Sequence, residues 1–256
     1  MDWIPEFYST TGEWWGEAES GITERDLRRV RLVRQYGGAG SLRVLDLGSS
    51  YGSTAAAVAQ AGHDVTGVEI SDRVAFSDRF SGGTGSLTFV KEDFYVARFP
   101  DRFDVVCYWN GFGVGSDDDQ RRLLARIATE WLRPGGVALV DVSNPFVWAS
   151  WHGDEEHRTP DAAAGYRFDL RERTTFDPVT CTAVDTWWQT CDPEHPISQT
   201  LRCYTPADLA LLLGGIGLQL TRLIVGELSF PPSPRPGLSE LLRDHHEYLA
   251  ILHRDP

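Results

Sequence analysis

The chain has 256 residues, 41% of them hydrophobic, and a formal net charge of −13. This length suffices for one elaborated α/β domain and is short for two independent ones, so we expect a single domain over residues 1–256. The acidic charge argues against a nucleic-acid partner, because such binding draws on clustered Lys and Arg, and Lys91 is the only lysine.

The composition also argues against a membrane segment and against a bound metal. The apolar stretches are strand-sized and are interrupted by Asp, Gly or Arg, and the first residues show neither a basic leader nor a continuous apolar run. The four cysteines lack CxxC spacing, and the adjacent His245 and His246 cannot form an i, i+4 ligand pair. We therefore expect a cytoplasmic protein with reduced thiols and no metal.

Residues 1–40 are expected to hold an N-terminal helical lid and the first core helix. Thr23 and Asp26 have the spacing of a capping box, and apolar residues follow at helical intervals until a glycine cluster from Gly37 ends the helix. Ahead of this helix lies an unusual concentration of aromatic residues, which we interpret as a segment that closes over a ligand: Trp3, Phe7, Tyr8, Trp14 and Trp15.

Residues 41–144 alternate between strand-like and helix-like segments. The strand-like segments are LRVLDLG, HDVTGVEI, SLTFVKEDF, FDVVCYWN and VALVDVS. Helical patterns lie between them, most clearly over residues 117–132, where apolar side chains share one helical face before Pro134 ends the pattern. Serial βαβ units predict a parallel sheet with helices on both faces.

The pattern changes after Asn144. Residues 145–204 contain short segments rich in Thr, Val and aromatics, typical of a small antiparallel insertion. Residues 205–256 open with Thr205 and Pro206 at the start of a helix, and the segments LQLTRLIVGE and EYLAILHR are expected to form two final strands.

The clearest chemical signal lies at the end of the first predicted strand. There the sequence Asp46-Leu47-Gly48-Ser49-Ser50-Tyr51-Gly52 places glycines where the backbone can turn tightly under a ligand at a helix N-terminus. Glu69 ends the next strand about 20 residues later, where a carboxylate can accept hydrogen bonds from ribose hydroxyls. The GxGxxG pattern is incomplete, which disfavours a nicotinamide cofactor.

These motifs, taken in order over residues 42–145, resemble the class I S-adenosylmethionine-dependent methyltransferases of the small-molecule type. The resemblance covers the glycine loop, Glu69, the KEDF segment, Asn110 after the fourth strand and the RPGG segment before the fifth. It implies an α/β fold with a Rossmann-like, mostly parallel seven-stranded sheet, an N-terminal helical lid and a small antiparallel β insertion. EYLAILHR would be the antiparallel last strand of that sheet.

The resemblance also implies S-adenosylmethionine as the cofactor. Asp46 and the loop backbone would hold its methionine part, Glu69 its ribose, Asp93 the adenine amino group and Phe94 the adenine ring. The full set of predicted cofactor contacts is Asp46, Gly48, Ser49, Ser50, Gly52, Glu69, Ile70, Asp93, Phe94 and Asn110. Ser50 stands where the family often has glycine, so we expect the loop to sit slightly differently here.

A general base is the least constrained part of the prediction. His152 and His157 follow the fifth strand, at the edge where the pocket of such a sheet lies, and are the candidates; exposed loop histidines with no catalytic role are the alternative. The predicted substrate-binding residues are aromatic: Tyr8, Trp14, Trp15, Phe112, Trp148 and Trp151.

We therefore expect methyl transfer to an O, N or C atom of a small, partly apolar molecule, with specialised metabolism as the setting. The alternative is a protein of this fold that binds the cofactor and catalyses a non-methylating reaction such as a cyclisation, or only binds. Protein or nucleic-acid methylation is disfavoured by the charge and by the missing two-proline motif after Asn110. Both a monomer and a homodimer remain open.

Overall fold

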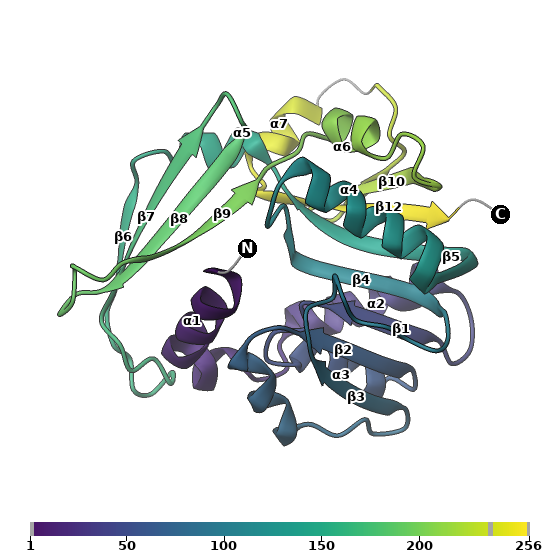
Figure 1. Cartoon of the computed structure of the whole chain (residues 1–256), viewed down its shortest axis with the longest axis horizontal. Helices are drawn as coiled ribbons and strands as arrows, with labels where there is room; N and C mark the ends of the chain where they lie inside the picture. The colour runs from purple at the N-terminus through teal and green to yellow at the C-terminus, as the bar shows by residue number, and fades with distance from the viewer. Residues whose placement is uncertain (1–2, 235–237, 255–256) are drawn as a thin grey trace.

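The computed structural model describes residues 3–234 and 238–254, and its largest element is an eight-stranded sheet (Figure 1). The strand order is β11-β10-β12-β5-β4-β1-β2-β3. The strands are β1 (Arg43–Leu47), β2 (Asp64–Glu69), β3 (Ser86–Lys91), β4 (Phe103–Phe112), β5 (Leu132–Ser143), β10 (Leu218–Val225), β11 (Leu228–Phe230) and β12 (Glu247–Arg254).

The topology of this sheet confirms the predicted fold class. Strands β1 to β5 run parallel, and β12 pairs antiparallel with both β5 and β10. All seven predicted strands are present. The eighth, β11, is a three-residue hairpin partner of β10, and it is too short to give a sequence pattern of its own.

Helices cover both faces of the sheet. Neighbouring residues of each central strand point to opposite sides, and because both sets are apolar, both faces have to be buried. On one face, Val44 and Val105 pack in an apolar cluster with α2 (Glu24–Gly37) and α3 (Ser53–Gln60). On the other, Leu45 and Val106 pack against α4 (Asp117–Arg126), a following π-helical turn and α6 (Pro206–Leu212). Figure 1 shows α4 in front of the sheet and α2 and α3 behind it. The structure also contains the short helices η1 (Asp72–Arg79), α5 (Pro145–Ser150) and α7 (Leu238–Arg243).

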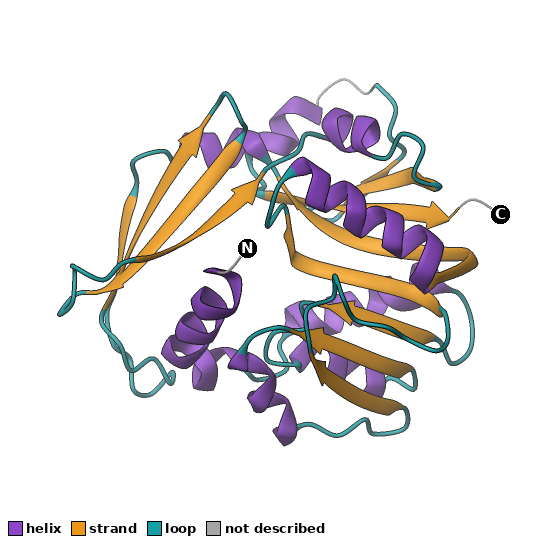
Figure 2. Cartoon of the chain, viewed as in Figure 1, coloured by secondary structure: helices purple, strands orange, loops and turns teal. Residues whose placement is uncertain are grey.

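The predicted antiparallel insertion is a separate four-stranded sheet, which stands apart from the large one in Figure 2. Its strands are β6 (Glu155–Arg158), β7 (Leu170–Asp177), β8 (Thr182–Gln189) and β9 (Ile197–Arg202). Strand β6 was expected to be a loop. It is an exposed edge strand of sequence EEHR. Charged side chains protect such an edge from pairing with another chain. The same charges leave the segment without the alternating apolar residues by which a strand is recognised in a sequence.

Helix α1 (Trp3–Glu19) lies between the small sheet and η1. Phe7 and Trp14 on one side of α1 are buried against Leu170 and Trp187 of the small sheet. On another side, Gly12 and Gly16 let α1 approach η1 so closely that a Cβ added at Gly16 would lie 2.1 Å from the Phe76 ring. The helix expected at the N-terminus is confirmed; its action as a lid stays a prediction.

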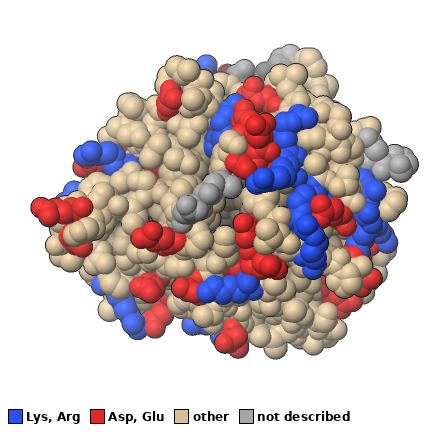
Figure 3. All heavy atoms as spheres, viewed as in Figure 1, with Lys and Arg blue, Asp and Glu red and all other residues tan. Residues whose placement is uncertain are grey.

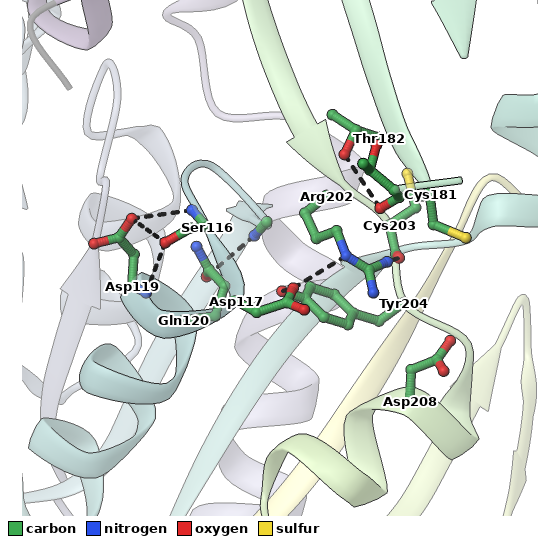
Figure 4. Close-up of polar contacts among 12 residues, drawn as sticks. Ser116, Asp117, Asp119, Gln120, Cys181, Thr182, Arg202, Cys203, Tyr204 and Asp208 are labelled. Carbon is green, nitrogen blue, oxygen red and sulfur yellow. Dashed lines mark hydrogen bonds and ion pairs between the residues drawn. The ribbon is translucent and has the colours of Figure 1, made fainter. Parts of the chain in front are cut away.

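A group of polar contacts links the small sheet to the large one at the N-terminus of α4 (Figure 4). The Arg202 guanidinium pairs with Asp117 (3.0 Å), and the Tyr204 hydroxyl donates to the same carboxylate (2.7 Å). The backbone N–H of Arg202 donates to the carbonyl of Gly113 (2.8 Å). These contacts tie the end of β9 to the segment that follows β4, so the two sheets are joined close to the carboxyl edge of the large one.

Candidate active site

A cavity of about 880 Å³ lies at the carboxyl edge of β1, β2 and β4 and is bounded on its other side by α1. The ends of parallel strands meet at this edge, so polar side chains that are distant in sequence converge there. From the large sheet come Asp46, Glu69 and Asn110, and from α1 come Tyr8 and Trp15.

The loop after β1 has the tight backbone that its glycines predict. Gly48 and Gly52 adopt positive φ angles of 60° and 86°, and Ser50 does so as well, at 51°. This left-handed conformation favours glycine, which is the residue expected at that position from the family resemblance. Ser50 is held there by its backbone N–H, which donates to Glu69 (2.8 Å), and by Arg73, which donates to its hydroxyl (3.3 Å).

Glu69 organises two loops at once. One carboxylate oxygen accepts the Ser50 N–H, and the other accepts both the N–H (2.8 Å) and the hydroxyl (2.6 Å) of Ser71. The side chain is 5% exposed and lies on the cavity wall. Because an ionised carboxylate offers about four acceptor positions, Glu69 keeps capacity for a ligand hydroxyl while it holds the loops.

Asp46 has a different environment. It is 3% exposed, and neither carboxylate oxygen has a hydrogen-bond partner within the described residues. Burial raises the pKa of this carboxyl to about 7, against the opposing effect of Arg29. A buried, unpaired carboxyl is costly, so its presence at the end of β1 indicates that a cationic or hydrogen-bonding ligand group completes it.

Other unpaired polar atoms gather on the same cavity. Within the described part of the chain, four further lining residues carry a buried side-chain polar atom without a hydrogen-bond partner: Trp15 Nε1, Ser49 Oγ, Tyr51 Oη and Trp109 Nε1. Such atoms are rare in a folded protein unless a ligand or water satisfies them. Their concentration here identifies the cavity as a ligand site.

The predicted cofactor residues meet at this cavity with one exception. Ile70, Asp93, Phe94 and Asn110 line it along with the residues already described. Gly52 does not line the cavity: it is the N-cap of α3, and a Cβ there would lie 2.7 Å from the Phe89 ring.

The comparisons with known proteins agree with this geometry. A family model described as a methyltransferase domain matches residues 44–136, which run from β1 into β5 and include the cofactor loop, Glu69 and Asp93. Residues 44–136 are a methyltransferase domain. The match confirms the predicted class, an S-adenosylmethionine-dependent methyltransferase, and with it the cofactor. No curated protein sequence matches the chain.

Three solved methyltransferases share the fold. The CcbJ methyltransferase from Streptomyces caelestis is 20% identical, with a TM-score of 0.71 over 93% of this chain and 92% of that one. The sugar N-methyltransferase KedS8 from Streptoalloteichus is 19% identical, with a TM-score of 0.61 over 93% and 87%. CalS10, an amino pentose methyltransferase from Micromonospora echinaspora solved with S-adenosylmethionine bound, is 15% identical, with a TM-score of 0.56 over 99% and 97%.

On the substrate side of the methyltransferase, only part of the predicted aromatic set reaches the cavity. Tyr8 and Trp15 line it. Trp14 is buried between α1 and the small sheet, and Phe112 packs in the core beside Tyr204. Trp148 and Trp151 lie on and just after α5, in contact with each other (ring centroids 5.1 Å apart) and not on the cavity wall.

The two candidate histidines are not brought to the cavity either. His152 accepts a hydrogen bond from the backbone N–H of Phe176 (3.0 Å) at the end of β7. His157 lies on the edge strand β6, where its imidazole pairs with Asp169 (2.6 Å). The segment after β5 contacts β7 of the small sheet and continues into β6, so position in sequence after a parallel strand did not place these side chains at the site.

Several cavity residues escaped the sequence prediction. Arg29 of α2 reaches the wall, where it donates to Asp141 (3.2 Å) and lies 4.8 Å from the Trp109 ring centroid. Arg73 of η1 links α1 to the cofactor loop through Tyr8, Thr11 and Ser50. Tyr51 and Trp109 adjoin predicted motif residues and could have been found by that adjacency, whereas no pattern in the sequence distinguishes Arg73 from other arginines.

Among residues 3–234 and 238–254, no helix is both long and apolar enough to cross a membrane. On the face drawn in Figure 3, basic side chains lie intermixed with acidic ones. The absence of a nucleic-acid partner, the cytoplasmic location and the oligomeric state stay predictions.

Proposed function

We propose that the protein transfers the methyl group of S-adenosylmethionine to a nitrogen or oxygen atom of a small, partly apolar molecule. The observation that carries this proposal is the cavity itself, where a buried unpaired Asp46 lies beside Glu69 at the strand ends of a methyltransferase domain. Its volume of about 880 Å³ falls within the range of small-molecule sites. Aromatic walls from α1 suit an apolar part of the acceptor.

The residues present fit the cofactor. The unpaired Asp46 carboxylate is suited to an ammonium group, which would replace the hydration that Asp46 lacks. Glu69 has acceptor capacity left for ribose hydroxyls. Asp93 accepts one hydrogen bond from the backbone N–H of Tyr95 (2.8 Å) and has a second oxygen for an amino group, with Phe94 beside it on the wall.

S-Adenosylmethionine supplies an electrophilic methyl group on a sulfonium centre. The task of the chain is then to hold the acceptor atom in line with that methyl group and to keep water out. The large sheet fixes the cofactor side of the cavity, and α1 covers the acceptor side with Ile4, Tyr8 and Trp15. A neutral amine acceptor needs no general base before attack, which agrees with the described lining residues, since none of them is a histidine.

We expect a nitrogen acceptor before an oxygen acceptor because of two proteins of similar fold. Two of the compared structures are described as an amino pentose methyltransferase and a sugar N-methyltransferase, and both align with at least 93% of this chain. Amino sugars and other small amines are therefore the first acceptors to test, with phenols and alcohols as the oxygen series.

The test is incubation with methyl-labelled S-adenosylmethionine and these acceptors, followed by mass analysis of the products. A product in which a methyl group replaces one N–H or O–H hydrogen, together with S-adenosylhomocysteine and a released proton, is the expected result. Cofactor consumption that yields an isomer or cyclised product without a methyl group would support the non-methylating alternative. Stoichiometric cofactor binding without turnover of any acceptor would contradict the small-amine and alcohol proposal.

A further inference from the structure

Tyr8 of α1 lies on the cavity wall, and its hydroxyl reaches across to the small sheet. There it donates a hydrogen bond to Oε1 of Gln199 on β9 (3.0 Å). Burial raises the pKa of the phenol above its usual range, so the hydroxyl keeps its proton under physiological conditions. The proton of Tyr8 is thus engaged on the side away from the cavity.

The direction of this hydrogen bond is fixed by two more residues behind it. Asp185 on β8 faces Gln199 across the strand pair and is 4% exposed. Its Oδ2 accepts from the side-chain amide of Gln199 (2.9 Å) and from the indole of Trp187 (2.8 Å). An indole N–H is only ever a donor, so this oxygen has to accept.

The donor and acceptor roles of Gln199 and Tyr8 follow from the role of Asp185. Because Asp185 accepts, Gln199 must turn its NH₂ toward Asp185 and its carbonyl toward Tyr8. Because that carbonyl can only accept, Tyr8 must donate to it. The Tyr8 oxygen then has acceptor capacity alone for any further partner, and the cavity is where such a partner can approach.

We propose that Tyr8 accepts a hydrogen bond from an N–H or O–H group on the methyl acceptor, and that Gln199 and Asp185 are positioning residues that fix Tyr8 in this direction. The inference rests on the proposed function and deepens it by stating which acceptors are taken. A primary or secondary amine holds its hydrogen on Tyr8 and directs its lone pair elsewhere, toward the methyl group. A tertiary amine has no such hydrogen and is excluded as a substrate.

The experiment uses the best amine found with methyl-labelled S-adenosylmethionine, supplied in its unmethylated, monomethylated and dimethylated forms. Wild-type protein should methylate the first two and leave the third unchanged. Tyr8→Phe removes the accepting oxygen and should lower kcat/KM about tenfold or more, as for the loss of one hydrogen bond in a closed site. Gln199→Met, which keeps the chain length but frees the Tyr8 hydroxyl, should give a loss of similar size.

Two further variants separate positioning from a general effect on packing. In Asp185→Asn the amide oxygen can occupy the position of Oδ2 and accept both hydrogen bonds, so this variant should keep most of the activity, whereas Asp185→Leu should resemble Gln199→Met. The Tyr8→Phe/Gln199→Met double variant should lose no more than either single one, because both act through the same hydroxyl. S-Adenosylhomocysteine binding, followed by calorimetry, reports that each variant is folded.

The outcomes distinguish the two proposals. If amines are methylated but Tyr8→Phe stays within twofold of wild type, or if the dimethylated amine is a substrate, the role of Tyr8 is overturned and the proposed function stands. If the loss of kcat/KM in the double variant equals the combined losses of Gln199→Met and Tyr8→Phe, Gln199 acts independently of Tyr8 and is not a positioning residue. If no amine or alcohol is methylated while the cofactor binds, the proposed function itself fails.

Discussion

The two walls of the cavity are built in different ways. The cofactor wall belongs to one sheet, and its key hydrogen bond, from Ser50 to Glu69, joins residues only 19 apart in the chain. The opposite wall is formed by α1, which is backed by the small sheet, and its key hydrogen bond, from Tyr8 to Gln199, joins residues 191 apart. The first wall is built on the strand ends of the large sheet and the helices that pack on it, whereas the second exists only when α1 is docked.

This difference assigns separate tasks to the two walls. A wall made of neighbouring strand ends is preorganised for the ligand that every turnover uses. A wall made by docking one helix against two other elements can open to admit and release molecules. Changes in the large sheet should therefore alter cofactor affinity, and changes at α1 should alter turnover more than cofactor affinity.

The largest effect is expected from Glu69→Ala. This change removes the acceptor for three hydrogen bonds that hold Ser50 and Ser71, as well as the proposed contacts to ribose. We expect the affinity for S-adenosylhomocysteine to fall by about 1 to 3 kcal/mol or more, since the lost bonds are charge-assisted. Calorimetry measures this, with the exposed neighbour Glu92→Ala as the control, which should bind like wild type. Equal affinity in both variants would remove Glu69 from the site.

A smaller effect, and one confined to the docked wall, is expected from Gly16→Ala. The new Cβ would lie 2.1 Å from the Phe76 ring, so α1 or the Phe76 side chain must shift. Overpacking of this kind costs about 1 to 3 kcal/mol. Turnover should fall more than cofactor affinity, because Trp15 and Tyr8 move with the helix. Gly21→Ala is the matched control, since among the described residues no atom beyond the two chain neighbours lies within 4 Å of the added Cβ. Equal turnover in both variants would mean that the packing of α1 on η1 is not needed for catalysis.

The same contrast explains how much could be predicted from sequence. Asp46, Glu69 and Asp93 each end or follow a strand, so a spacing rule along the chain locates them at one edge of a parallel sheet. Tyr8 was found because aromatic residues cluster before the first core helix. Gln199 and Asp185 were not found, because their significance arises only when β8, β9 and α1 are packed together, and no local pattern records that contact.

The residues that were predicted only from their position after a strand do not line the cavity. Trp148, Trp151 and His152 follow a parallel strand, as a substrate residue should, but α5 packs against β7 and β8 of the small sheet and these side chains do not line the cavity. Phe112 extends β4 and its side chain turns into the core. Position after a strand therefore identifies the edge, and the path of the following loop decides which side chains stay there.

Asp46 should make cofactor binding depend on pH. The pKa of its carboxyl is raised to about 7 by burial, and an ammonium partner favours the ionised form, so binding requires loss of a proton below that pH. Affinity should rise about tenfold per pH unit between pH 5 and 7 and then level off. Calorimetry in buffers of different ionisation enthalpy should show proton release. Asp46→Asn should bind more weakly and without this slope; a slope that persists in the variant assigns the proton to another group.

The effect of Asp46 on protein stability has the opposite pH dependence to its effect on cofactor affinity. The Asp46 carboxyl of the free protein has a pKa above its unfolded value, so the folded chain binds more protons than the unfolded chain between about pH 4 and 7. The contribution of Asp46 to the free energy of unfolding is therefore greatest at low pH and is lost as the pH rises toward 7. S-Adenosylhomocysteine should reduce this dependence, which thermal unfolding with and without ligand measures.

The smallest effects are expected from His152→Ala and His157→Ala. His152 accepts one backbone hydrogen bond at the end of β7, His157 pairs with Asp169 on an exposed edge strand, and neither lines the cavity. With an amine acceptor, kcat of both variants should stay within a few-fold of wild type, and the acidic limb of the pH–rate profile should be unchanged. A general base at the reacting atom would instead lower kcat by about 10² to 10⁴ on removal. A loss of that size in either variant, with cofactor affinity intact, would mean that the loop after β5 folds over the cavity during turnover and that the wall opposite the cofactor is completed by more than α1.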